Sequence, residues 1–247
     1  MSYPNFVNKH LEKALFGPKD FSAKNILKNF PENALIVYSR HLLDYIKRKY
    51  RPKKLKKVIV GADVYLHKNI AIIKMKGIGA PHAVTAFEEI ICFGVKNFLN
   101  IGIAGGLDDF GIYVCDKAIR DEGASSHYLA HEKYAYPDKK LTEELEKVLQ
   151  KNKVEYKKGT TWTIDAPYRE TVVEVKHYQS EGVKTVEMEA SALFAVAKLR
   201  GVRVASAFSV SDLVLPGKWE PHFDRRHIKI RLNKLVDSAI ELLRGMK

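Results

Sequence analysis

Cysteine is scarce in this chain, and long apolar runs are missing. The 247 residues contain two cysteines, Cys92 and Cys115, and each lies in an apolar stretch without CxxC spacing. This pattern excludes a disulfide framework and indicates reduced, buried thiols. No apolar run approaches the roughly 18 residues needed to span a bilayer. Residues 1–17 mix acidic and basic side chains and lack the apolar segment of a signal peptide. We therefore expect a cytoplasmic protein with no membrane association.

Internal repeats and low-complexity segments are also missing, and glycine and proline are spread along the chain as turn signals. A hydrophobic content of 46% with 10% aromatic residues excludes wholesale disorder. A length of 247 residues suits one domain with a sizeable core. We therefore expect a single domain over residues 1–247.

Positive charge is in excess, with a formal net charge of +13. Its densest contribution is the segment 47–57, KRKYRPKKLKK, in which eight of eleven residues are basic. A basic run can bind nucleic acid. Here Tyr50 is the one aromatic residue within it, and no nucleic-acid-binding motif follows. The segment is better interpreted as solvated, or as a general attraction for anions such as phosphate.

Strands and helices alternate along the chain, and the strands are followed by glycine turns or polar residues. The spacing predicts a strand over 70–76, a turn over 77–81, a helix over 82–95, a strand over 98–104 that ends at Gly105 and Gly106, a further strand within 111–129, a helix over 142–153 with Thr142 as its N-cap, a strand over 202–212 and a helix over 226–243. This order predicts an α/β fold of three layers, α/β/α. Ligands of such sheets bind beyond the carboxyl ends of the strands, where these turns meet.

Two glutamates stand at the start of an apolar segment, TVEMEASALFAVA (185–197). Apolar residues from Ala190 onward recur at helical spacing, so Glu187 and Glu189 lie where an extended stretch becomes a buried helix. One interpretation is that the acids stabilise the helix N-terminus. The other is that both side chains point into one cleft, because residues two apart on an extended chain share a face. Sugar hydroxyls would supply the donors that carboxylates in apolar surroundings need.

Asp212 closes a run of small and apolar residues, VASAFSVS. A carboxyl group in that position is partly desolvated, which suits a general acid. An equally good interpretation is that Asp212 caps the N-terminus of whatever follows.

Five motifs together resemble the nucleoside phosphorylase-I superfamily, which includes purine nucleoside phosphorylases, uridine phosphorylases and methylthioadenosine nucleosidases. They are GIGAPHAVTAFEEI, FLNIGIAGGL, RDEGASSHYL, TVEMEASALFAVAKLRGV and SVSD, in that order. The resemblance covers about residues 70–240, and residues 1–60 diverge. It implies that the central sheet is mixed and partly barrel-like.

The resemblance implies cleavage of an N-glycosidic bond. Glu189 is then expected to accept hydrogen bonds from the ribose hydroxyls, with Met188 packed on the sugar and Glu187 close by. Asp212 matches the aspartate that protonates N7 of a purine. Arg225 is placed like the assisting arginine, with Arg226 as its alternative.

The base subsite is expected around residues 160–171. This stretch, TTWTIDAPYRET, lacks the glutamine by which uridine-specific members bind uracil, so purines are favoured over uridine. Trp162, Tyr168 and Arg169 are the candidate base contacts, and WEPHF (219–223) is expected to anchor a loop over the base. His127 and His131 are four residues apart, but no third ligand is placed, so we expect no metal.

The phosphate site departs from the family pattern. Asn100 and Ile103 stand where phosphorylases have an arginine and a Ser or Thr, and an isoleucine cannot bind phosphate by hydrogen bonds. Arg40, Gly79 and Asn100 are the candidate phosphate contacts. Phosphorolysis to free base and ribose 1-phosphate, without a cofactor, is the expected activity. Hydrolysis, as in the nucleosidases, is the alternative, and a non-catalytic nucleoside- or RNA-binding protein is a third. Similar proteins form dimers or hexamers with shared sites, so we expect a homo-oligomer.

Overall fold

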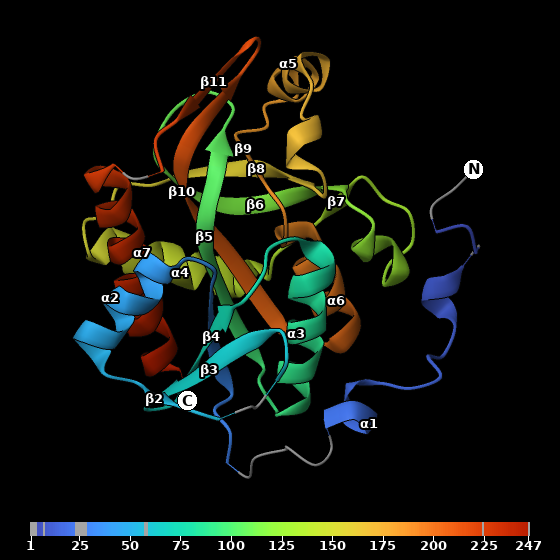
Figure 1. The fold of residues 1–247 in the computed structure, drawn as a ribbon, viewed down its shortest axis with the longest axis vertical. Helices are drawn as coiled ribbons and strands as arrows, with labels where there is room; N and C mark the ends of the chain where they lie inside the picture. Colours follow the sequence, from blue (N-terminus) through green and yellow to red (C-terminus); the bar gives the residue numbers. More distant parts are fainter. Residues whose placement is uncertain (1–3, 7, 23–28, 57–58, 224, 247) are drawn as a thin grey trace.

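The computed structural model describes residues 4–6, 8–22, 29–56, 59–223 and 225–246. Figure 1 shows a central sheet with helices on both sides. The α-helices are α1 (Pro18–Ser22), α2 (Arg40–Tyr50), α3 (Ala80–Cys92), α4 (Lys139–Lys151), α5 (Val172–Ser180), α6 (Ala190–Arg200) and α7 (Arg226–Gly245). Short 3-10 helices span Lys9–Leu11, Ala124–His127 and Pro167–Arg169.

Within the described ranges, the sheet has eleven strands and is mixed. They are β1 (Asn33–Val37), β2 (Lys53–Lys54), β3 (Ala62–His67), β4 (Ile70–Met75), β5 (Asn97–Gly106), β6 (Ile112–Asp121), β7 (Tyr134–Ala135), β8 (Lys157–Ile164), β9 (Thr185–Glu187), β10 (Arg203–Leu215) and β11 (Lys218–Pro221). The order is β11-β10-β6-β8-β9-β5-β1-β4-β3-β2, with β7 on β6. Because β10 also pairs with β5, the strands β10, β6, β8, β9 and β5 close into a barrel. This confirms the predicted α/β layers and the partly barrel-like sheet.

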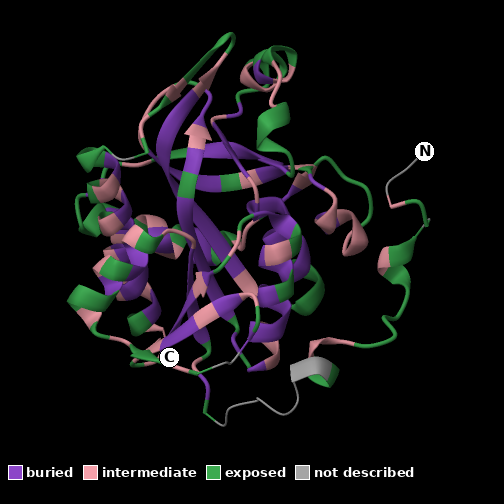
Figure 2. Ribbon diagram, in the orientation of Figure 1, coloured by how far each residue is buried: buried purple, intermediate pink, exposed green. Residues whose placement is uncertain are grey.

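Side-chain alternation along the strands builds one apolar core on each side of the sheet. In β1, Ala34 and Ile36 pack with residues of α3 and α6, whereas Leu35 and Val37 pack with residues of α2 and α7. Successive residues of a strand point to opposite faces, so a strand covered on both sides is apolar throughout. Figure 2 shows this burial along the sheet.

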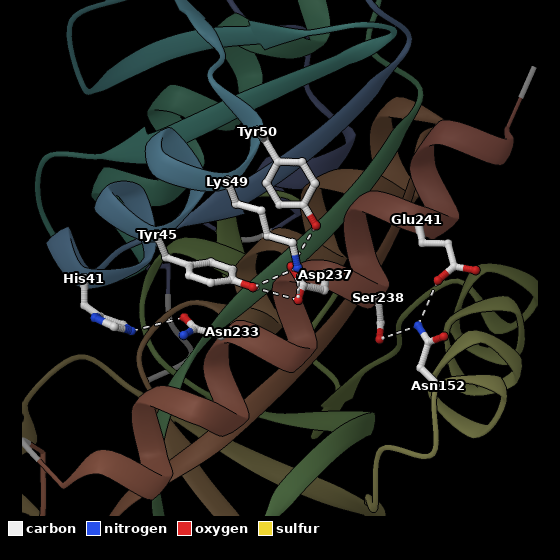
Figure 3. Close-up of polar contacts among 9 residues, drawn as sticks. All are labelled: His41, Tyr45, Lys49, Tyr50, Asn152, Asn233, Asp237, Ser238 and Glu241. Atoms are coloured by element: carbon white, nitrogen blue, oxygen red, sulfur yellow. Dashed lines mark hydrogen bonds and ion pairs between the residues drawn. The ribbon is translucent and has the colours of Figure 1, made fainter.

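Helix α2 is held on α7 by a polar cluster (Figure 3). Asp237 of α7 accepts hydrogen bonds from the hydroxyls of Tyr45 and Tyr50, both at 2.7 Å, and forms an ion pair with Lys49 at 2.7 Å. One turn earlier, His41 and Asn233 are hydrogen-bonded at 3.1 Å. These contacts fix the position of α2, whose first residue follows the end of β1 closely.

The predicted elements are present, with one wrong cap and two strands that run on. Helix α4 begins at Lys139, because Asp138 caps it by accepting the N–H of Leu141 at 2.7 Å. Thr142, predicted as the N-cap, is inside the helix and donates its hydroxyl to the Asp138 carbonyl. Strand β10 continues past Asp212 to pair with β11, and β5 continues through Gly106. Among the described residues, no helix combines the length and apolarity that crossing a membrane requires.

Candidate active site

A cavity of about 340 Å³ lies where the ends of several elements meet. Its lining includes Tyr38 and Ser39 after β1, residues 102–105 of β5, Glu187, Met188 and Glu189 at the start of α6, and Ser211 and Asp212 of β10. These segments are far apart in the sequence, and the sheet brings them together because β5 pairs with β9 and with β10. The structure therefore gathers four of the predicted site residues, Glu187, Met188, Glu189 and Asp212, around one space.

Glu187 is buried and its carboxylate already has three donors. One oxygen accepts the Thr163 hydroxyl at 2.6 Å, and the other accepts the backbone N–H groups of Glu189 and Ala190 at 2.9 and 2.8 Å. Burial, and then the nearby Glu189 carboxylate, raise the pKa of Glu187, whereas these hydrogen bonds oppose the rise. Glu187 thus holds the start of α6 in place and has little capacity left for a ligand.

Glu189 is the glutamate with room for a ligand. Its Oε1 accepts the N–H of Gly79 at 2.6 Å, the backbone of Met188 also hydrogen-bonds to this carboxylate, and the residue lines the cavity. Gly79 has a φ of +92°, a conformation that favours glycine and that aims this N–H at Glu189. Burial raises the pKa of Glu189. Met188 lies beside this contact, because its Cε would be 3.8 Å from a Cβ added at Gly79.

Asp212 is fixed at another part of the cavity. Its Oδ1 accepts the Ser211 hydroxyl at 2.7 Å, and its Oδ2 accepts the Trp219 indole N–H at 2.8 Å. The register of β10 against β5 shifts between Val210 and Asp212, and such a bulge re-aims a side chain. Asp212 therefore lies inside a long strand, and it is not the N-cap of a following helix.

Glu170 is a second carboxyl group in this part of the cavity, and the sequence did not single it out. It follows the 3-10 helix Pro167–Arg169 and directly precedes Thr171, the N-cap of α5. Burial, and then the charges of Asp212 and Glu174, raise the pKa of Glu170 to about 7. An acid next to a helix cap is usually explained by the cap alone, so sequence carried little signal for this residue.

The fold and this geometry agree with the similarity of the chain to proteins of a known family. Residues 26–241 match the Phosphorylase superfamily. The chain belongs to this superfamily. This confirms the resemblance predicted from the motifs.

Two relatives are similar to this chain in sequence, and one solved structure is similar to it in fold. The purine nucleoside phosphorylase DeoD-type 1 of Shewanella oneidensis is 28% identical over 232 residues, which cover 91% of this chain and 94% of that protein. The guanosine phosphorylase of Halorubrum lacusprofundi is 32% identical over 177 residues, covering 65% and 73%. The AMP nucleosidase of Bacteroides thetaiotaomicron has a TM-score of 0.74 at 20% identity, covering 93% and 95% of the two chains, a likeness of fold.

The candidate phosphate contacts of this superfamily member are dispersed. The Arg40 side chain is 92% exposed and pairs with Asp44. Asn100 is buried in the sheet, where its side-chain amide donates to Ser206 at 3.1 Å. The Gly79 N–H is occupied by Glu189. Among the described residues that line the cavity, none is Lys, Arg or His. A phosphate in this cavity would therefore rely on neutral donors or on residues from elsewhere.

The candidate base contacts also lie outside the cavity wall. Trp162 is fully buried in a separate cluster and donates its indole N–H to Asp121 at 2.8 Å. Tyr168 is 99% exposed, and Arg169 is exposed beside it. The residue of this stretch that lines the cavity with Glu170 is Pro167. The sequence predicts that Trp162 is a buried residue of a strand. It does not show in which of the apolar clusters the side chain lies.

The segment WEPHF (219–223) contributes to the site at both ends. Trp219 lies in β11 and donates to Asp212, and Phe223 lines the cavity. Arg225, expected to assist Asp212, is exposed just before α7 and does not line the cavity, and Arg226 is exposed as well. Within the described parts of the chain, no group of three or more His, Cys, Asp or Glu side chains is arranged to hold a metal ion.

Proposed function

We propose that this chain cleaves the N-glycosidic bond of purine nucleosides. The observation that carries the proposal is that one cavity holds the Glu187 and Glu189 carboxylates and, separately, the Asp212 carboxyl group. Breaking the bond gives the sugar the character of an oxocarbenium ion, which nearby carboxylates stabilise. The departing base needs a proton, which a positioned carboxyl group can donate.

Each carboxyl group has a separate role in this proposal. Glu189 accepts hydrogen bonds from the ribose hydroxyls, with Met188 against the sugar. Glu187 holds Glu189 in position through the Glu189 backbone N–H. Asp212 donates a proton to the base, and Glu170 beside it accepts from an N–H group of the base. A purine offers N7 as the proton acceptor and an N–H or amino group as the donor, so the pair suits a purine better than uracil.

Phosphate is the nucleophile that superfamily membership and the two relatives favour. The products are then free base and ribose 1-phosphate, and the reaction needs no cofactor. In a homo-oligomer, a neighbouring copy that supplies a basic residue would provide the positive charge that the described cavity lining lacks. Hydrolysis is the second candidate, and the observation that favours it is that no described residue of the lining is Lys, Arg or His, since each lost charge-assisted contact to phosphate costs about 1.5–3 kcal/mol.

The test is release of free base from inosine, guanosine, adenosine and uridine by the purified protein, with and without phosphate. Purine release that requires phosphate supports phosphorolysis, and purine release that ignores phosphate supports hydrolysis. The absence of base release from all four, together with salt-dependent RNA binding, would contradict the enzyme proposal in favour of a binding protein.

Asp212→Asn is expected to lower purine release by about 10²–10⁴-fold, because an amide cannot donate the proton that the leaving base needs. The matched control is Asp63→Asn, which removes a carboxylate of β3 that pairs with Lys54 at 3.2 Å away from the cavity. This control is expected to retain wild-type turnover. Unchanged turnover in Asp212→Asn would remove Asp212 from the mechanism.

A further inference from the structure

Tyr38 lines the cavity with a hydroxyl group to which the proposed function assigns no role. The residue follows the last residue of β1, and its hydroxyl oxygen is buried. Among the described residues, this oxygen has no hydrogen-bond partner. A buried polar atom without a partner costs free energy, so it calls for an explanation. A ligand that supplies the missing partner is one.

The surroundings of Tyr38 keep its hydroxyl protonated. Burial, and then the negative charges of Glu189 and Glu187, raise the pKa of Tyr38 well above its ordinary value. The hydroxyl is therefore a neutral hydrogen-bond donor throughout the physiological pH range. It requires an acceptor, and neither glutamate accepts it in the structure.

The position of Tyr38 along β5 relates it to Asp212. A Cβ added at Gly102 would be 3.5 Å from the Tyr38 ring, and a Cβ added at Gly105 would be 3.6 Å from Asp212 Oδ2. These glycines are three positions apart along the strand, a distance of about 10 Å. Tyr38 and Asp212 both line the cavity, and they lie at different places along β5. A base protonated by Asp212 places Tyr38 beyond the sugar.

The nucleophile must approach on the same side of the sugar as Tyr38. When the bond to the base breaks, the attacking oxygen approaches the sugar carbon from the face opposite the base. Helix α2 begins here, since Ser39 is its N-cap and both Ser39 and Leu42 line the cavity. The partial positive charge of an α-helix N-terminus favours an oxygen-rich or anionic group. The hydrogen bond between His41 of α2 and Asn233 of α7 in Figure 3 holds this helix end in place.

We propose that Tyr38 binds the nucleophile of the reaction by donating its hydroxyl hydrogen to an oxygen of phosphate or of water. The inference rests on the proposed function, because it takes the base to lie at Asp212. The nucleophile oxygen bonds to the sugar carbon as the bond to the base breaks. The electron pair passes to the base, and Asp212 supplies the proton. Tyr38 keeps its own proton throughout. When water is the nucleophile, the proton that the water loses passes to a cavity carboxylate.

Tyr38→Phe tests the proposal, because it removes the hydroxyl and keeps the ring over Gly102. If phosphate is the nucleophile, the KM for phosphate is expected to rise about 10- to 100-fold while the KM for the nucleoside stays unchanged. If water is the nucleophile, kcat is expected to fall by a similar factor at an unchanged nucleoside KM. The matched control is Tyr65→Phe, a buried tyrosine of β3 outside the cavity lining, which is expected to retain both parameters.

Thermal unfolding separates this role from a structural one. A hydroxyl that stabilises the fold would lower Tm when removed, whereas removal of a buried donor without a partner is expected to leave Tm equal to or above that of the wild type. A Tm that falls in parallel with activity would overturn the proposal. So would kinetic parameters equal to those of the wild type, or a rise confined to the nucleoside KM.

Binding of inorganic phosphate, measured by calorimetry on the wild type and on Tyr38→Phe, requires no turnover. A wild-type protein that binds phosphate but releases no base would contradict the proposed function, and loss of phosphate binding in Tyr38→Phe would then still support the role of Tyr38. A wild type that neither binds phosphate nor releases base would overturn both.

Discussion

Thr163 connects Glu187 to the first turn of α6 through a single hydroxyl group. The hydroxyl donates to Glu187 Oε1 at 2.6 Å and accepts the backbone N–H of Ser191 at 3.1 Å. Because the Ser191 N–H can only donate, the Thr163 proton must point to Glu187. Thr163 is fully buried, so water does not compete for this contact. We infer that Thr163 positions Glu187 and favours its ionised form against the burial that raises its pKa.

Thr163→Val is expected to remove this donor while keeping the volume of the side chain. The pKa of Glu187 should then rise further, so the acidic limb of the pH profile of base release should move to higher pH. Turnover near neutral pH should fall about tenfold or more, as the loss of a hydrogen bond to a charged group implies. Thr163→Ser, which keeps the hydroxyl, should restore the wild-type profile. A Thr163→Val profile that superimposes on the wild type would disprove this role.

Residues of the site were predictable from sequence where a polar side chain interrupts an apolar run. Glu187, Glu189 and Asp212 stand out because they lie beside small and apolar neighbours. Tyr38 and Glu170 gave no such signal, since a tyrosine at a strand end and an acid before a helix are ordinary. Their importance depends on which distant segments face them, and local sequence does not contain that information.

At the scale of elements, the parallel pairing of β5 with β10 packs closely against the end of β5. A Cβ added at Gly106 would lie 2.7 Å from the Asp109 carbonyl oxygen and 2.7 Å from a methyl carbon of Val210. Backbone cannot move away as a flexible side chain can. A Cβ added at Gly102 would meet nothing closer than 3.5 Å. In the same strand, packing therefore requires glycine at position 106, whereas at position 102 it leaves room for a methyl group.

Gly106→Ala is expected to destabilise the protein by about 1–3 kcal/mol, the usual range for an overpacked core. Gly102→Ala is the internal comparison and is expected to change the free energy of unfolding by less than about 1 kcal/mol. Urea denaturation of both variants measures the difference. Equal stability of the two would show that the strands near Gly106 can separate to admit a methyl group.

Elements were predictable where periodicity is strong, and their pairing was not. Alternating strands and helices predicted the layers, and β4, β5, α6 and α7 lie close to their expected ranges. The sequence interpretation did not recognise β1 and α2, although the run NALIV fits a strand buried on both faces. Barrel closure depends on β10 pairing with β5, a contact between segments about a hundred residues apart, which no local pattern specifies.

On the scale of the whole molecule, charge is distributed unequally between surface and cavity. The chain has a net charge of +13, yet the cavity lining contains Glu170, Glu187, Glu189 and Asp212 and, among the described residues, no basic side chain. Surface ion pairs such as Lys96–Glu32 are exposed and contribute little to stability. Glu170, Glu187 and Glu189 matter more, because burial raises the pKa of each and ionising them in the cavity therefore opposes folding. Stability should therefore depend on pH through the site.

The raised pKa of Glu170 determines the direction in which stability changes with pH. Its pKa rises from the ordinary 4.5 to about 7 on folding, mainly by burial. The native state thus binds the proton more tightly than the unfolded state, and the resulting stability is full below about pH 4.5 and is lost as pH rises through about 7. Glu170→Gln cannot ionise and escapes the loss. The Tm of Glu170→Gln relative to the wild type should therefore increase between pH 5 and pH 8.

Glu241→Gln is the matched control, because Lys151 and Asn152 lower the pKa of Glu241 and keep that carboxylate charged over the whole range. Its Tm difference from the wild type should stay constant from pH 5 to pH 8. A Glu170→Gln difference that is equally flat would mean that Glu170 is ionised at little cost in the native state. The carboxyl group would then face water. A solvated Glu170 would not fit the proposed role, in which a desolvated carboxyl group beside Asp212 binds an N–H group of the purine.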